Sequence, residues 1–190
     1  MWQAIRTAVL LFAVMTFLTG ILYPFAVTGL AQALFPRQAN GSLIKINGEK
    51  LASELVGQPF SESRYFWGRP SAIRPLAYNG ASSTGSNLGP SNPALMEAIQ
   101  KRVTALRSAD PDTQMPIPVD LVTASGSGLD RHISPAAALY QTSRVAMARG
   151  IDERKVADLI RTCIMDRQFG ILGEPTVHVL RLNMALDAMH

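Results

Sequence analysis

Thirty consecutive residues near the N-terminus, 7–36, carry neither a charged side chain nor a histidine. A membrane-spanning helix needs roughly 20 mostly apolar residues to cross about 30 Å of hydrocarbon. The run 8–27 is long enough, and its apolar character continues to Leu34. The sequence therefore predicts a short tail at 1–7, a transmembrane helix with its extension at 8–34, and a soluble mixed α/β domain with a small sheet at 35–190.

A cleaved signal peptide is the alternative interpretation of the apolar segment. Its core would span roughly 7–15 residues and end at a small-x-small cleavage site, and A-Q-A at 31–33 has that form. The core is too long for a signal peptide, and Pro24 interrupts its far end, so a retained helix is favoured. Arg6 precedes the span and three basic residues follow it by position 50. Positive charges therefore do not favour an N-terminus inside the cell.

One face of the predicted helix carries small residues. Ala13, Thr16 and Gly20 recur at three- and four-residue spacing, which places them on the same side of a helix. Small side chains let a second helix approach closely, and such packing is a main attraction between helices in lipid. We expect this face to contact a helix of another subunit.

The composition excludes several classes of protein. The residues after the apolar segment hold 17 of the 18 Lys and Arg and all 14 Asp and Glu, so their net charge is near +3. A charge this small, without basic clusters, does not indicate nucleic-acid binding. The single cysteine, Cys163, lies in an apolar helical pattern. We expect it to pack in the core, because it has no partner for a disulfide or a metal site.

Local patterns predict few strands and several helices in the soluble part. Strands are expected at 42–46, entering an Asn47-Gly48 turn, at 119–124 and at 176–182. Helices are expected at 51–56, from Pro93 after a Ser91 or Asn92 cap, at 134–149, at 152–167 and at 182–189. Residues 79–93 are almost all Gly, Ser, Thr, Asn and Pro, which predicts a long loop.

Motifs for ATP hydrolysis are missing from the chain. It has neither the phosphate-binding pattern G-x-x-x-x-G-K-[ST] nor D-K-T-G-T, the phosphorylation sequence of P-type pumps. His132 and His178 lack a nearby His or Cys at metal-ligand spacing, so a zinc site is not expected. We therefore predict no catalytic residues and no cofactor bound by this chain.

A polar turn and an aromatic block are the candidate functional segments. The turn supplies Ser125, Ser127, Asp130 and His132 before a helix N-terminus, where backbone N–H groups can hold an anion or a partner carbonyl. The same residue types permit a membrane-anchored hydrolase, although 125–129 does not match G-x-S-x-G.

The aromatic block is the second candidate segment and reads Y-F-W-G-R-P-S-A at 65–72. Its residues Tyr65, Phe66, Trp67 and Arg69 are of the types that dominate interface hot spots. Anchoring of the core is the alternative role for the same side chains. An anchored binding module thus remains a further interpretation of the chain.

Five motifs in order resemble one known family. They are the aromatic block, S-N-L-G-P-S-N-P-A-L at 86–95, D-L-V-T-A-S-G-S-G-L-D at 120–130, I-S-P-A-A-A at 133–138 and L-G-E-P-T-V-H-V-L-R-L-N-M-A-L-D at 172–187. With one N-terminal helix, the chain resembles the KdpC family, the small subunits of the bacterial Kdp potassium-transporting ATPase. It departs from the family pattern at Arg131, where proline is common, and around 168–169.

The resemblance implies a role in a larger complex. A channel-like subunit would bind potassium and a P-type subunit would hydrolyse ATP, so potassium, Mg and ATP would be handled by the complex. The small subunit would cross the bacterial inner membrane once, with its domain on the extracytoplasmic side. It would serve assembly and stability and would raise the ATP affinity of the pump subunit as a catalytic chaperone.

The resemblance also singles out one glutamine. A glutamine in the second soluble helix is proposed in the family to contact nucleotide, and the matching residue is Gln141 in L-Y-Q-T-S-R-V-A. A domain outside the cytoplasm cannot touch cytoplasmic ATP. The exterior placement therefore favours an indirect, allosteric effect on ATP affinity.

Overall fold

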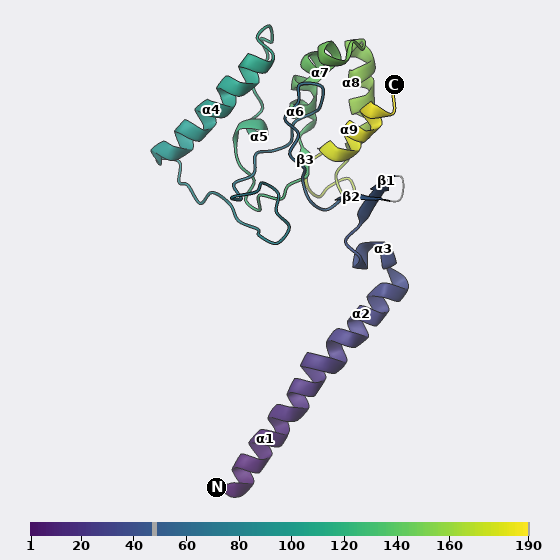
Figure 1. The fold of residues 1–190 in the computed structure, drawn as a ribbon. Helices are drawn as coiled ribbons and strands as arrows, with labels where there is room; N and C mark the ends of the chain where they lie inside the picture. Colours follow the sequence, from purple (N-terminus) through teal and green to yellow (C-terminus); the bar gives the residue numbers. More distant parts are fainter. Residues whose placement is uncertain (47–48, 190) are drawn as a thin grey trace. The chain divides into compact units, whose positions relative to one another are not determined.

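The computed structural model describes residues 1–46 and 49–189 of the 190-residue chain. The chain divides into two compact units, Met1–Leu55 and Val56–His190, and Figure 1 shows the elements of each. The predicted Asn47-Gly48 turn lies outside the described residues.

A long apolar helix dominates the first unit. It runs through α1 (Trp2–Phe17), the π-helical turn η1 (Leu18–Leu22) and α2 (Tyr23–Leu34). The helix Trp2–Leu34 has 33 residues, and an 18-residue window within it reaches a mean hydropathy of 2.1, which suits a membrane span by length and composition. The predicted helix is thus confirmed as a candidate span.

The π-helical turn precedes a proline. Pro24 has no N–H to donate to the carbonyl of Gly20, which would be its acceptor in a regular α-helix. At Leu18–Leu22 the backbone forms a π-helical turn, in which an N–H group bonds to the carbonyl five residues earlier. The hydrogen-bonding pattern of the helix therefore changes where the regular bond to Gly20 is missing. Pro24 then lies in the first turn of α2, where a missing N–H costs least.

The rest of the first unit is a short helix and a hairpin. Helix α3 (Pro36–Ala39) is followed by β1 (Leu43–Ile46) and β2 (Glu49–Ser53), which pair antiparallel with Leu43 opposite Ser53. The helix predicted at 51–56 is therefore wrong. The neighbouring strand offers backbone partners that outweigh a short helical pattern, because an isolated helix of six residues is unstable.

The second unit combines six helices with a small sheet in its described part. The helices are α4 (Pro93–Ala109), α5 (Val119–Val122), α6 (Pro135–Tyr140), α7 (Thr142–Arg149), α8 (Glu153–Cys163) and α9 (Val179–Asp187). The strands are β3 (His132–Ile133), β4 (Ile164–Met165) and β5 (Thr176–His178), in the antiparallel order β3-β5-β4. This arrangement confirms the predicted mixture of helices with a small sheet.

The core lies between the sheet and its helices. Helices α6, α8 and α9 all contact β5, and Figure 1 shows these green and yellow elements gathered together. Val156 and Ile160 of α8, Val177 of β5 and Leu182 of α9 have no exposed surface. Cys163 is half-buried against this core, as expected for a packing role.

Helix ends that depend on local chemistry lie where the sequence predicted them. The side chains of Asn92, Ser134 and Asp152 accept hydrogen bonds from backbone N–H groups of the following turns. Gly150 ends α7 in the left-handed conformation, with φ of 66°. Residues 79–92 contain no helix or strand, so the predicted loop is confirmed.

Several strand and helix predictions are wrong, and tertiary pairing explains them. The predicted strand 119–124 is the single helical turn α5, which begins after Pro118 and buries Leu121 and Val122. The predicted helix 152–167 ends at Cys163, because the next two residues pair with β5. The strand predicted at 176–182 ends at His178, where the helix expected from 182 already begins.

Candidate functional site

The side chain of Gln141 is buried and holds the aromatic block in place. Its Oε1 accepts hydrogen bonds from the Trp67 N–H (2.8 Å) and from Arg144 Nη2 (2.7 Å). Its Nε2 donates to the carbonyls of Trp67 (3.2 Å) and Ala137 (3.1 Å). An amide group accepts two hydrogen bonds and donates two. Gln141 is only 1% exposed, so its capacity is filled by the protein itself.

Gln141 also interrupts a helix that the sequence predicted to be continuous. Helices α6 and α7 meet at this residue, whose N–H donates to the carbonyl of Ala138, three residues earlier. The carbonyl of Ala137, the regular α-helical acceptor, instead accepts the Gln141 side chain. Side chains that compete for backbone partners tighten or break helices in this way.

Asn183 forms a second clamp beside the first. Its Oδ1 accepts from the Phe66 N–H (2.8 Å) and its Nδ2 donates to the Phe66 carbonyl (3.0 Å). Asn183 is 1% exposed and Phe66 is fully buried. Two amide side chains therefore pair with two consecutive backbone units, as a neighbouring strand would.

Arg144 completes the support around the block. Its guanidinium donates to the carbonyls of Ser63 (2.6 Å) and Tyr65 (3.1 Å), and its carbon Cζ lies 4.3 Å from the centroid of the Trp67 ring. Burial lowers the pKa of Arg144 to about 10, although the negative charges of Asp110 and Tyr140 act to raise it. The group stays cationic at neutral pH and so keeps its stacking on Trp67.

The predicted interface residues differ in how they are placed. Phe66 belongs to the core, whereas Tyr65, Trp67 and Arg69 are partly exposed. Tyr65 donates a hydrogen bond of 3.3 Å to Asp187, which also pairs with Arg149 at 2.6 Å. A partner could reach the three partly exposed side chains without unfolding the core.

The serines of the polar turn serve the turn itself. Ser125 Oγ accepts from the N–H groups of Ser127 (3.2 Å) and Gly128 (3.1 Å), and Ser127 Oγ accepts from Leu129 (3.2 Å). These backbone N–H groups of the turn are therefore already used within it. The glycine at 128 has φ of 69°, and a side chain there would meet Ile73 within 3 Å.

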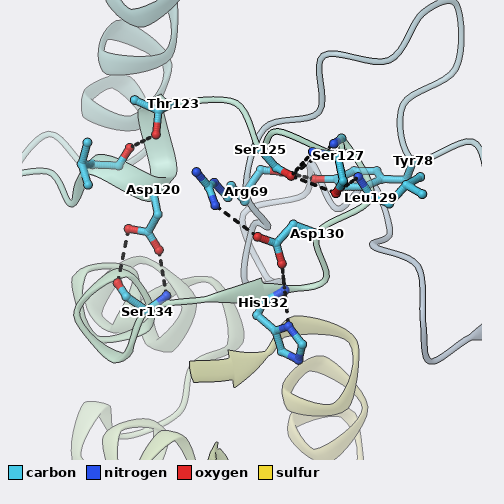
Figure 2. A network of polar contacts seen from close by, with 12 residues as sticks. Arg69, Tyr78, Asp120, Thr123, Ser125, Ser127, Leu129, Asp130, His132 and Ser134 are labelled. Atoms are coloured by element: carbon cyan, nitrogen blue, oxygen red, sulfur yellow. Dashed lines mark hydrogen bonds and ion pairs between the residues drawn. The ribbon is translucent and has the colours of Figure 1, made fainter. Parts of the chain in front are cut away.

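Asp130 joins the polar turn to the aromatic block. Figure 2 shows its carboxylate between Arg69 and His132, with Oδ2 3.2 Å from Arg69 Nη1 and Oδ1 accepting from the His132 N–H at 3.0 Å. The His132 side chain, its backbone N–H and the Arg69 guanidinium lower the pKa of Asp130 to about 2, although burial opposes them. Both halves of this arrangement were candidates in the sequence, and the structure brings them together.

The geometry gives no support to a serine hydrolase. His132 faces Asp130, with Nδ1 at 3.7 Å from Oδ1, and its Nε2 accepts from Arg131 at 3.3 Å. The hydrogen bonds of the Ser125 and Ser127 hydroxyls stay within their own turn, so neither hydroxyl is paired with His132 as a nucleophile with its base. Within residues 1–46 and 49–189, no group of three or more His, Cys, Asp or Glu side chains could hold a metal ion.

Two of the small residues predicted to share one face of the candidate span, Thr16 and Gly20, lie on the same side of the helix. A methyl group added to Gly20 would lie 4.0 Å from Cγ2 of Thr16, so the two residues share a side of the helix. Added bulk at Gly20 would project from this side, together with the neighbouring Ala13.

Sequence reasoning missed Asn183 and Arg144. A signal existed for Asn183, because it lies among apolar residues at helical spacing in α9, where a polar side chain must find a buried partner. Gln141 shows the same pattern, because Ala137, Ala138 and Val145 around it in α6 and α7 are buried. Neither pattern indicates which backbone the amide will bind.

Comparison with known proteins gives a consistent result. The family model KdpC, described as K⁺-transporting ATPase, c chain, matches residues 5–188. The chain is 61% identical over 184 residues to the potassium-transporting ATPase KdpC subunit of Methylococcus capsulatus, with 97% of each chain covered. It is 57% identical to that of Sorangium cellulosum over 96% of each chain, and 56% identical to that of Polaromonas naphthalenivorans over all of this chain and 96% of the relative.

Proposed function

The chain belongs to the KdpC family, and on this premise we propose that it is a non-catalytic accessory subunit of an ATP-driven potassium uptake complex. The match over residues 5–188 is the observation that carries this proposal. One apolar helix cannot enclose an ion pathway, so conduction belongs to companion subunits. Its relatives are named as subunits of a potassium-transporting ATPase, which supports the same assignment.

The proposed companions are a channel-like subunit that binds potassium and a P-type subunit that hydrolyses ATP. Potassium, Mg and ATP are then handled by these chains. The helix Trp2–Leu34 anchors the subunit in the bacterial inner membrane, and its length and hydropathy support that role. The domain lies on the extracytoplasmic side, which is the placement that the family resemblance implies.

The subunit contributes assembly, stability and a raised ATP affinity of the pump. We attribute the last effect to coupling between subunits instead of a direct contact with nucleotide. Gln141 is the residue on which a direct contact would depend, and its hydrogen-bonding capacity is used within the domain. Couplings of this kind amount to about 1–3 kcal/mol, or roughly 5–150-fold in affinity.

The test is co-purification from membranes of potassium-starved cells. The full-length chain, tagged at its C-terminus, is extracted in mild detergent and its companions are identified by mass. We expect a channel-like and a P-type subunit in stoichiometric amounts. Purification of the chain alone, under conditions in which those subunits are present in the membrane, would overturn the proposal.

A further inference from the structure

A pocket of about 260 Å³ opens beside the aromatic block. It lies between α4, α5 and the segment that contains the block, and α4 packs on α5. Its apolar walls are Phe60, Trp67, Pro70, Ala105, Leu106 and Leu121. Trp67, a predicted interface residue, is one of these walls, but the proposed function assigns no role to the pocket.

The pocket is small for a cofactor and well sized for one side chain. Sites for cofactors and drug-sized ligands usually enclose roughly 300–1,000 Å³. Interfaces, in contrast, place single aromatic or large aliphatic side chains in such hollows, and these anchors supply much of the binding energy. The volume therefore favours an anchoring side chain of another protein.

The walls of the pocket are already fixed in place. Gln141 holds the Trp67 backbone and Arg144 stacks on its ring. Leu106 and Leu121 are 5% and 4% exposed and belong to the core. A pocket with fixed walls loses little conformational freedom on binding, which increases affinity.

A positive charge at the edge of the pocket indicates which group should accompany the apolar side chain of the partner. Arg102 lines the pocket, and its Nη1 donates to the Val122 carbonyl at 2.7 Å. Burial lowers the pKa of Arg102, and the charge of Arg74 lowers it further. In the described part of the chain Arg102 forms no ion pair. An unpaired cation beside an apolar hollow complements a carboxylate.

We propose that this pocket receives one large apolar side chain of a companion subunit, and that an Asp or Glu of the same segment pairs with Arg102. The inference rests on the proposed function, because it requires a companion subunit beside the domain. It adds the surface through which the domain docks and the chemistry of the segment that it recognises.

The first experiment identifies the segment in the assembled complex. A photoreactive benzophenone side chain is introduced at Ala105, which lines the pocket, and as a control at Thr104, which is exposed on α4 but does not line it. Irradiation of the purified complex should cross-link position 105 to a companion peptide with a large apolar residue and a nearby Asp or Glu. Equal cross-linking from both positions, or cross-links from 105 to lipid only, would overturn the proposal.

The second experiment tests the contacts themselves. Ala105→Trp fills the pocket and should reduce retention of the companion by roughly tenfold or more, as the loss of a hot spot does, whereas Thr104→Trp should not. Arg102→Glu should also weaken retention, and Lys at the cross-linked acidic position should restore it. If both pocket variants assemble like wild type, the pocket is not the docking surface, although the proposed function stands. If wild type itself lacks companions, the proposed function fails.

Discussion

The amide of Gln141 forms hydrogen bonds with both the N–H and the C=O of Trp67, although 74 residues separate the two in sequence. Asn183 does the same for Phe66. Side chains of the α6–α7 junction and of α9 thus replace the partner strand that this extended segment lacks. The position of the aromatic block, and of the pocket beside it, follows from two buried amides.

Replacing Gln141 by Ala should destabilise the domain and loosen Trp67. The change leaves the N–H and C=O of Trp67 without partners, and unsatisfied buried groups cost about 1–3 kcal/mol each. We expect the free energy of unfolding to fall by roughly 2–4 kcal/mol. Denaturant unfolding measures this change, and faster hydrogen exchange at the Trp67 amide locates it. Gln100→Ala on the exposed face of α4 is the control, and an equal effect there would contradict the assignment.

Arg144→Lys should destabilise although the charge is kept. Lysine has no planar fork, so it cannot reach the carbonyls of Ser63 and Tyr65 while stacking on Trp67. We expect a loss of roughly 1–3 kcal/mol, measured by thermal or denaturant unfolding of the full chain. Arg154→Lys, an exposed position on α8, should change little. Similar stability of wild type and Arg144→Lys would show that the fork geometry is unimportant.

Asp130 should make stability depend on pH in acid. Its pKa in the folded chain, about 2, lies below the ordinary value of 3.8. The contribution is therefore complete above about pH 4 and is lost as the pH falls toward 2. Asp130→Asn should cost roughly 2 kcal/mol at pH 5, and this difference from wild type should vanish near pH 2.

The control for this experiment is Asp158→Asn, which removes an exposed ion pair with Arg161. Exposed pairs of this kind contribute little, so no comparable dependence on pH is expected. Denaturant unfolding at several pH values gives the comparison. A constant difference between wild type and Asp130→Asn from pH 5 to pH 2 would refute the assigned ionisation.

Gly20→Leu should weaken assembly in the membrane. The added side chain projects from the face that Gly20 shares with Thr16, where close approach of a second helix is expected. Gly29→Leu is the matched control, because nothing lies within 4 Å of a side chain added there. Recovery of companion subunits in mild detergent provides the measurement. Equal losses for both variants would place the helix contact on another face.

Features set by neighbouring residues could be predicted from the sequence, and features set by distant ones could not. The caps at Asn92, Ser134 and Asp152 require only a short polar side chain before a helix. The strands β4 and β5 exist because each supplies the other's backbone partners, so their short sequences carry no sufficient signal. The hydrogen bonds of the Gln141 amide go to the backbone of Trp67, which is far away in the chain, and no local sequence pattern indicates this partner.

The apparent ATP affinity of the pump separates direct from indirect action. Gln141 and Asn183 are equally buried and perform equivalent tasks on consecutive residues. If the subunit acts through the shape of its docked domain, Gln141→Ala and Asn183→Ala should lower the affinity to a similar extent, within the roughly 5–150-fold range of allosteric couplings. A nucleotide contact would make Gln141→Ala far more damaging than Asn183→Ala at equal loss of stability.

The measurement is ATPase activity against ATP concentration for the reconstituted complex, with subunit content matched between variants. A selective effect of Gln141→Ala, together with photolabelling near Gln141 by an ATP analogue, would overturn the indirect mechanism. Parallel effects of the two variants would instead assign Gln141 to the support of the aromatic block, because each amide holds the backbone of one residue of that block.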